Sequence, residues 1–397
     1  MNDDRGGKKS WKGWKCDDLT PDLCSLNEQK GTILVKGDIN LTYWKYESLD
    51  TLSNEGDKLP IIAIHGGPGV AHNYLLPLKQ QACRGRTVIF YDQAGCGESK
   101  LPENASLIDY PWLLDPKYYS LEELPQLVDY LGLNNYHVVG NSWGSLLCQM
   151  FSLDAADERL ASMVLSGTFS DAQHYVQGQW DPEDGNLGSL PPYVQKRFHE
   201  LEDAREYKSE EYEAIVRVLT DFFTCRTAPA PDCVNDAHAG TNEEIYVGMQ
   251  GPSEFSIAGS LEHYNVTARL ATLALPVLLT SGKFDTMRPK VVEETYRALP
   301  IAEWVLLERS GHMSMVDEPG PMNDAIAYFF DRVEASRASG KPFLASLNSP
   351  DMSLSEPVPP FHGLEILGAI LFSAAVGWIL GYYSSNRQRP GGKNSKL

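Results

Sequence analysis

The stretch HVVGNSWGSLLCQMF, residues 137–151, places a serine between two glycines at the point where an apolar run ends. The valines before the serine are typical of a buried strand, and the apolar residues after it recur at helical spacing. Residues 140–144, the serine turn, therefore have the pattern G-x-S-x-G between a strand and a helix. A strained serine at a helix N-terminus is well placed as a nucleophile, so Ser142 is a candidate. The alternative is an ordinary tight turn in which Ser142 only caps the helix.

Short apolar runs alternate with helical patterns on both sides of the serine turn. A hairpin is predicted over residues 32–46, and an amphipathic helix is predicted from Ser120, with Glu123 completing a capping box. Further buried strands are expected within residues 60–69, 86–99, 162–167, 275–285 and 303–312. This alternation predicts the α/β class, with a mostly parallel central sheet covered by helices on both faces.

One long insertion interrupts the alternation. Residues 168–273 are helical, aromatic and acidic, without buried-strand runs, and they fall between two core strands. They predict a helical lid over the C-terminal ends of the strands, where such sheets bind ligands. The predicted organisation begins with a polar basic segment (1–30), a first core part (31–167), the lid (168–273) and a second core part (274–338). A linker (339–362), an apolar transmembrane helix (363–385) and a basic tail (386–397) follow.

Composition and cysteine usage limit the classes of partner and compartment. The formal net charge of −19 argues against nucleic acid, and no C-x-x-C or H-E-x-x-H spacing predicts a metal. The N-terminal stretch has no apolar signal-peptide core. The seven cysteines allow disulfides in the two C-x7-C pairs, Cys16/Cys24 and Cys225/Cys233, but without a signal sequence we expect free thiols.

Two residues beyond the insertion complete a candidate catalytic set. Asp285 and His312 each follow a predicted strand, so Ser142, Asp285 and His312 have the chain order of the α/β-hydrolase fold. His312 would take the serine proton, and Asp285 would orient the imidazole and stabilise its charged form. The main-chain N–H groups of Gly67 and Trp143 would stabilise the oxyanion. This chemistry needs no cofactor.

Several blocks of the sequence resemble the proline iminopeptidases, in the branch of the tricorn-interacting aminopeptidase and the L-amino acid amidases. The resemblance covers Leu34–Ser336, and its blocks are HGGPG (65–69), YDQAGCGES (91–99), GNSWGS (140–145), MQGPSEFSIAGSL (249–261) and SGKFDTMRP (281–289). It implies a serine exopeptidase or amidase that removes an N-terminal residue, often proline, or hydrolyses small amino-acid amides.

The resemblance also implies how the substrate's free ammonium is bound, and here the chain departs from its relatives. The family uses the Glu of G-P-x-E-F, which matches Glu254, and the tricorn-interacting branch has a second Glu where this chain has Thr286. A lid acid, Glu202 or Glu206, is a candidate substitute, against the alternative of a solvated helix face. Asn141 replaces the commoner Gly or Ser before the nucleophile, and we expect little effect from it.

Three functions therefore remain open. The first is an aminopeptidase or amidase that acts on peptides or small amides with a free α-amine. The second is a small-molecule esterase or lactonase that uses the same three residues, which the loss of one carboxylate at Thr286 favours. The third is a membrane-anchored binding protein without activity, because a fold alone does not define a function.

The C-terminal part has the pattern of a membrane span. Residues 366–383 are uncharged and mostly apolar, with aromatic side chains at the distal end, which is just long enough to cross a bilayer. We expect a single C-terminal anchor at 363–385, with the catalytic domain in the cytosol. Counting positive charges alone would instead place the basic tail in the cytosol.

Overall fold

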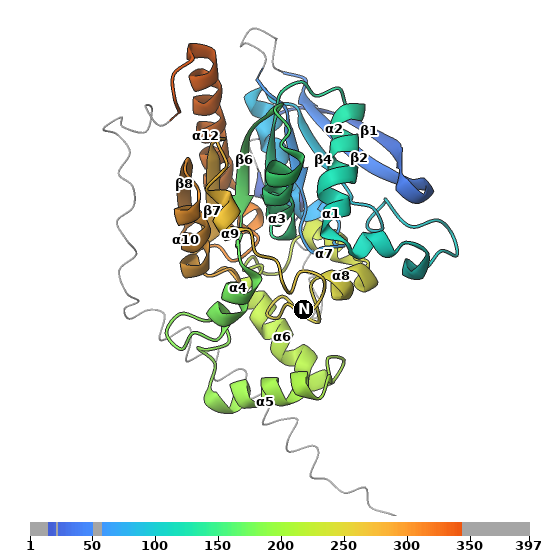
Figure 1. Cartoon of the computed structure of the whole chain (residues 1–397), viewed down its shortest axis with the longest axis vertical. Coiled ribbons are helices and arrows are strands. Elements are labelled where there is room, and N and C mark those ends of the chain that lie inside the picture. Colours follow the sequence, from blue (N-terminus) through green and yellow to red (C-terminus); the bar gives the residue numbers. More distant parts are fainter. Residues whose placement is uncertain (1–14, 21–22, 51–57, 344–397) are drawn as a thin grey trace, which may run out of the picture.

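The computed structural model describes residues 15–20, 23–50 and 58–343 of the 397-residue chain. Eight strands form one sheet in the order β1-β2-β4-β3-β5-β6-β7-β8 (Figure 1). From β4 to β8 neighbouring strands are parallel, whereas β1 pairs with β2, and β2 with β4, in antiparallel register. The strands are β1 (Leu26–Val35), β2 (Ile39–Ser48), β3 (Ile61–Ile64), β4 (Val88–Tyr91), β5 (Tyr136–Asn141), β6 (Leu160–Ser166), β7 (Val277–Gly282) and β8 (Ala302–Leu307).

Helices cover both faces of the sheet because its central strands are apolar on both sides. In β3, Ile62 and Ile64 join the core on one face, and Ile61 and Ala63 join the core on the other. The first face is covered by α1 (Pro116–Tyr118), α2 (Leu124–Tyr130), α3 (Trp143–Met150) and α10 (Pro289–Ala298), and the second by the 3₁₀ segment η3 (His72–Arg84), α11 (Ser314–Asp317) and α12 (Pro319–Ser339). The predicted α/β-hydrolase fold is confirmed.

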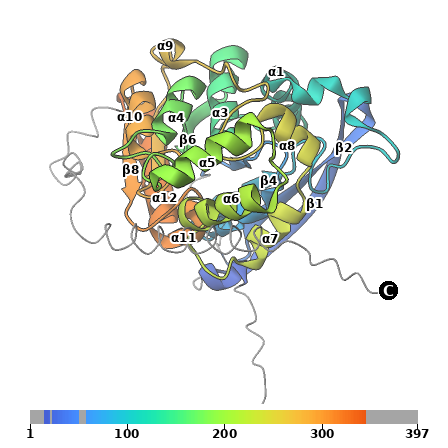
Figure 2. The same cartoon turned by 90° about the horizontal axis from the view of Figure 1, so that it is seen from below.

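The insertion between β6 and β7 contributes a small core of its own. Its apolar cluster includes Phe198, Tyr212, Leu219 and Phe223. The helices α5 and α6 lie beyond one end of the sheet (Figure 1) and cross in front of it when that end is viewed (Figure 2). The helices of the insertion are α4 (Ala172–Gln179), α5 (Pro192–Asp203), α6 (Glu210–Phe223), α7 (Asp232–Ala239), α8 (Glu243–Met249) and α9 (Thr267–Leu270).

The first hairpin is longer than predicted. Its turn at Gly37 and Asp38 has positive φ values of 76° and 60°, as a tight turn at these residues requires. However, β1 begins at Leu26, inside the segment 1–30 that was predicted to be a polar N-terminal extension. The reason is that β1 is an edge strand, and the polar side chains at its start are largely exposed to solvent.

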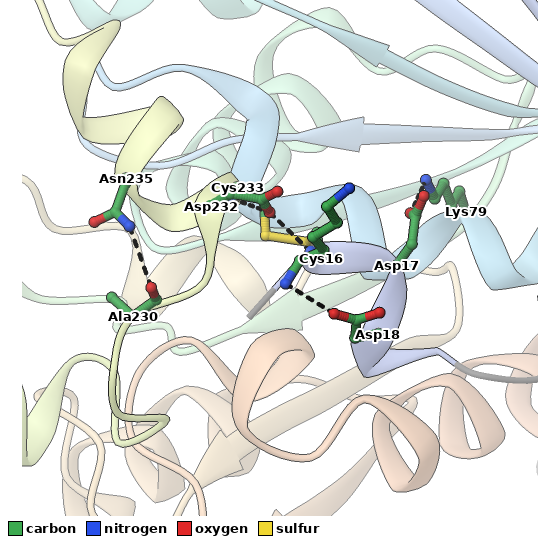
Figure 3. The surroundings of a disulfide bond; sticks show 9 residues. Cys16, Asp17, Asp18, Lys79, Ala230, Asp232, Cys233 and Asn235 are labelled. Carbon is green, nitrogen blue, oxygen red and sulfur yellow. Dashed lines mark hydrogen bonds and ion pairs between the residues drawn. A yellow bond between two sulfur atoms is a disulfide. The ribbon is translucent and has the colours of Figure 1, made fainter. Parts of the chain in front are cut away.

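Two disulfides correct the prediction of free thiols. Cys16 is bonded to Cys233 and Cys24 to Cys83, so the pairing by C-x7-C spacing is also wrong. Figure 3 shows the first bond, which joins η1 (Cys16–Leu19) to α7. The Asp232 carboxylate accepts hydrogen bonds from the N–H groups of both bonded cysteines, each at 2.8 Å. The spacing in sequence failed because the fold, and not the chain separation, decides which sulfur atoms meet.

The predicted membrane anchor also needs correction. Within residues 15–20, 23–50 and 58–343, no helix is both long enough and apolar enough to cross a bilayer. Even α12, at 21 residues, buries one side only and carries charged residues on the other. The segment 363–385 and the tail 386–397 lie outside the described residues. The finding overturns the prediction of a membrane protein with a cytosolic catalytic domain, and neither is retained.

Candidate active site

The serine turn adopts the strained geometry that its sequence predicts. Ser142 lies between β5 and α3 with φ 57° and ψ −127°, a conformation that L-residues rarely adopt. A Cβ atom at Gly140 would lie 2.3 Å from the Gly144 carbonyl oxygen, and one at Gly144 would lie 2.2 Å from the Ile64 carbonyl oxygen. Both glycines are therefore required, because only a residue without a side chain lets these backbones approach.

Asp285 and His312 meet at the C-terminal ends of β7 and β8. The His312 Nδ1 atom lies 2.6 Å from Asp285 Oδ1, and both side chains are buried. The Met287 N–H donates to the same carboxylate oxygen at 2.8 Å, which fixes the orientation of the carboxylate. Among the described residues, His312 Nε2 has no hydrogen-bond partner. One edge of the imidazole is thus held by Asp285, and the other is available to a reacting group.

The electrostatics of this pair favour a protonated imidazole. Burial alone would lower the pKa of His312, but the negative charge of Asp285 and its hydrogen bond outweigh burial and raise that pKa above its ordinary value. An imidazole with a raised pKa is a stronger base toward a hydroxyl proton once it is neutral.

A cavity of about 270 Å³ brings the candidate groups together. Ser142, His312, Gly67 and Glu254 all line it. Gly67 belongs to the loop after β3, and the neighbouring Gly66 N–H already donates to the Tyr74 hydroxyl at 2.7 Å. Trp143 does not line this cavity; its main-chain N–H lies at the first position of α3, directly after Ser142.

Glu254 is the one carboxylate among the described residues that line this cavity, and no Lys or Arg lines it. Its Oε1 atom accepts a hydrogen bond from the Tyr246 hydroxyl at 2.8 Å. Thr286 is buried and donates to Asp285 Oδ1 at 3.4 Å without lining the cavity. Neither Glu202, which accepts from Tyr212 at 3.4 Å, nor the exposed Glu206 lines the cavity.

Sequence reasoning missed one residue that the imidazole needs. Gly167 follows β6 with a φ of 52°, and a Cβ atom there would lie 2.6 Å from His312 Nδ1. The only signal was a glycine at the end of a buried strand, which is common in loops. Asp92, in the loop after β4, accepts hydrogen bonds from the main-chain N–H groups of His72 and Glu98 at 2.9 and 2.8 Å, so its carboxylate stabilises this loop.

Comparison with known proteins places the chain in a family. A family model described as alpha/beta hydrolase fold matches residues 60–319, so the chain is an α/β hydrolase. The proline iminopeptidase of Clostridium botulinum is 34% identical over 284 residues, which cover 70% of this chain and 92% of that protein. That of Lactobacillus delbrueckii subsp. lactis is 35% identical, over 66% of this chain and 86% of the relative. This chain belongs, with them, to the proline iminopeptidase family.

A solved structure agrees with this assignment. The crystal structure of the proline iminopeptidase from Mycobacterium smegmatis matches with a TM-score of 0.69 and 25% identity, over 78% of this chain and all of that one (100%). The predicted resemblance is therefore confirmed, and the protein is a hydrolase with an aminopeptidase-like function.

Proposed function

We propose that this hydrolase is a serine aminopeptidase or amino-acid amidase that cleaves the bond after a residue with a free α-amine. The observation that carries the proposal is one cavity in which Ser142 and His312 lie together with a single carboxylate, Glu254. A cavity with one carboxylate and no Lys or Arg in its lining favours a cationic group such as an α-ammonium.

The reaction would proceed through an acyl-enzyme. Ser142 Oγ attacks the substrate carbonyl while His312 Nε2 takes its proton, and Asp285 stabilises the imidazolium through Nδ1. The N–H groups of Gly67 and Trp143 donate to the oxyanion. The imidazolium then protonates the leaving amine, and water hydrolyses the ester by the same route. Ser142→Ala should abolish nearly all turnover and labelling by a fluorophosphonate probe; undiminished turnover would disprove the mechanism.

Glu254 decides between the aminopeptidase and the esterase. Glu254→Gln removes the charge that pairs with the ammonium, and breaking a water-poor ion pair in this way costs about 3–5 kcal/mol. We expect kcat/KM to fall by at least about a hundredfold on alanyl and prolyl arylamides, whereas simple esters without an amine should be hydrolysed nearly as before.

A lid carboxylate serves as the matched control. Glu202→Gln makes the same chemical change at a residue that does not line the cavity, so both substrate classes should be unaffected. An equal loss on both classes in Glu254→Gln would give that residue a structural role and favour the esterase. N-acetylated arylamides provide a further check, because an aminopeptidase should reject them.

A further inference from the structure

Two buried side chains, Tyr74 from η3 and Asn141 from the end of β5, form a continuous set of hydrogen bonds beside the candidate nucleophile. They are 2% and 1% exposed, and both line the cavity. The Tyr74 hydroxyl accepts from Gly66 N–H at 2.7 Å and donates to Asn141 Oδ1 at 2.9 Å. The Asn141 amide then donates to the His312 carbonyl oxygen at 3.3 Å and to the Ser166 carbonyl oxygen at 3.2 Å.

These bonds connect the three loops that carry the reacting groups. Gly66 directly precedes Gly67, Asn141 directly precedes Ser142, and the last acceptor is the main chain of His312 itself. The two side chains use their polar atoms fully, because the hydroxyl both donates and accepts and the amide does the same. Removing either would leave buried polar groups of the catalytic loops without partners.

We propose that Tyr74 and Asn141 are positioning residues. They fix the relative positions of the oxyanion loop (the loop after β3 with Gly66 and Gly67), the nucleophile Ser142 and the loop that carries the base His312. The proposal rests on the proposed acyl-enzyme mechanism. It assigns a role to Asn141, which resemblance alone marks as a replacement of little effect.

The site is too crowded to tolerate a small shift of these loops. A Cβ atom at Gly66 would lie 2.7 Å from Ser142 Cβ and 2.9 Å from the Asn141 carbonyl oxygen, so the oxyanion loop packs directly on the nucleophile. Displacing catalytic groups by about 1 Å can reduce a rate by about a hundredfold. We call the hydrogen bonds of Tyr74 and Asn141 the Tyr74–Asn141 bridge. Loss of this bridge should therefore reduce kcat, whereas KM should change little, because Glu254 still binds the substrate.

Three variants test the bridge. Tyr74→Phe removes only the hydroxyl, Asn141→Ala removes the amide, and Asn141→Asp keeps the acceptor for Tyr74 but sets an oxygen against the His312 carbonyl. For each we expect kcat, counted per probe-reactive Ser142, to fall about ten- to a hundredfold with KM within about threefold of the original. Tyr136→Phe is the matched control, since its buried hydroxyl donates to Asp157 at 2.9 Å at the other end of β5, and kcat should not change.

The double variant Tyr74→Phe/Asn141→Ala separates a bridge from two unrelated packing sites. If the residues act as one unit, the double variant loses no more than the worse single variant; multiplied losses would overturn the proposal. Unchanged kcat in Tyr74→Phe and Asn141→Asp would overturn it as well. Failure of the mechanism itself is recognised separately, because then Ser142→Ala would remain active. Counting per probe-reactive site removes the contribution of unfolded molecules.

Discussion

In the proposed mechanism, Asp285 acts on the reaction through the imidazole of His312. Its carboxylate sits 2.6 Å from Nδ1, receives the Met287 N–H, and raises the pKa of His312 despite complete burial. In that mechanism the base must be neutral to accept the serine proton, so we expect activity to fall as the pH drops through the pKa of His312. The acid limb of the pH profile should therefore report the pair that His312 forms with Asp285.

The variant Asp285→Asn should shift that limb and reduce the rate. Without the carboxylate charge, burial lowers the pKa of His312, so the acid limb of kcat/KM moves to lower pH. The amide also favours the wrong tautomer, for which a loss of about 10⁴-fold in kcat is expected. Measuring kcat/KM between pH 4 and 9 tests both statements. An acid limb that stays in place would mean that another group controls it.

At the scale of single residues, the sequence predicts the candidate catalytic residues but not the side chains that hold them in place. Ser142, Asp285 and His312 are recognisable because each follows an apolar run in a fixed chain order. The contact between Tyr74 and Asn141 has no such pattern, since it depends on how η3 packs against the end of β5. The sequence shows that Thr286 replaces a second carboxylate. It does not show that the threonine hydroxyl donates a hydrogen bond to Asp285.

The packing of the serine turn depends on its two glycines, Gly140 and Gly144, which have no side chain. Gly144→Ala would push a methyl group to 2.2 Å from the Ile64 carbonyl oxygen, which is main chain and cannot move aside. We expect a loss of about 3 kcal/mol in the free energy of unfolding, measured by urea denaturation, together with loss of probe labelling.

A glycine in an open position provides the comparison. Gly320 lies in α12, has no neighbouring atom within 4 Å of a built Cβ, and has no positive φ. Gly320→Ala should change the free energy of unfolding by no more than about 1 kcal/mol, because the higher helix propensity of alanine is offset by contact of its Cβ with the ring of the following Pro321. Equal effects of the two substitutions would show that packing at the turn is looser than described.

Helix boundaries were predicted less well than helix existence. The helix expected to begin at Ser120 starts at Pro116, because a π-helical segment, Tyr119–Glu123, joins α1 to α2. The Asp115 carboxylate caps it by accepting the Lys117 N–H at 3.0 Å. Glu123 points inward instead of closing a capping box; it accepts the Ala94 N–H at 3.0 Å, and burial raises its pKa to about 8. A local motif cannot reveal that tertiary packing needs the same carboxylate elsewhere.

Across the whole molecule, the Cys16–Cys233 disulfide connects the first described segment to the inserted helices. It spans 217 residues, and the helix it holds, α7, carries His238 in the wall of the cavity. Asp17 in η1 forms an ion pair with Lys79 of η3, which adds a second contact of this segment with the core. The linkage could not be predicted from the chain, because seven cysteines allow many pairings and spacing does not choose among them.

The variant Cys16→Ser should destabilise the protein by about 3–5 kcal/mol, because a long closed loop restricts the unfolded chain. Urea denaturation measures this loss. Cys225→Ser is the control, since Cys225 is a free thiol and its replacement should cost little. Labelling of the unreduced, denatured protein should find three thiols, Cys96, Cys148 and Cys225. If all seven react, the disulfides do not form.

The same bond gives the chain a covalent topology that its sequence order does not have. Residues 16–233 form a closed covalent ring that contains Ser142, whereas Asp285 and His312 lie in the part of the chain that follows this ring. A single peptide-bond cleavage inside the ring, for example in the exposed stretch 203–206 at the C-terminal end of α5, would open the ring without releasing either piece. Nicked molecules should therefore keep the full mass of the chain on a denaturing gel without reductant, and separate into two fragments only after the sulfur–sulfur bond is reduced.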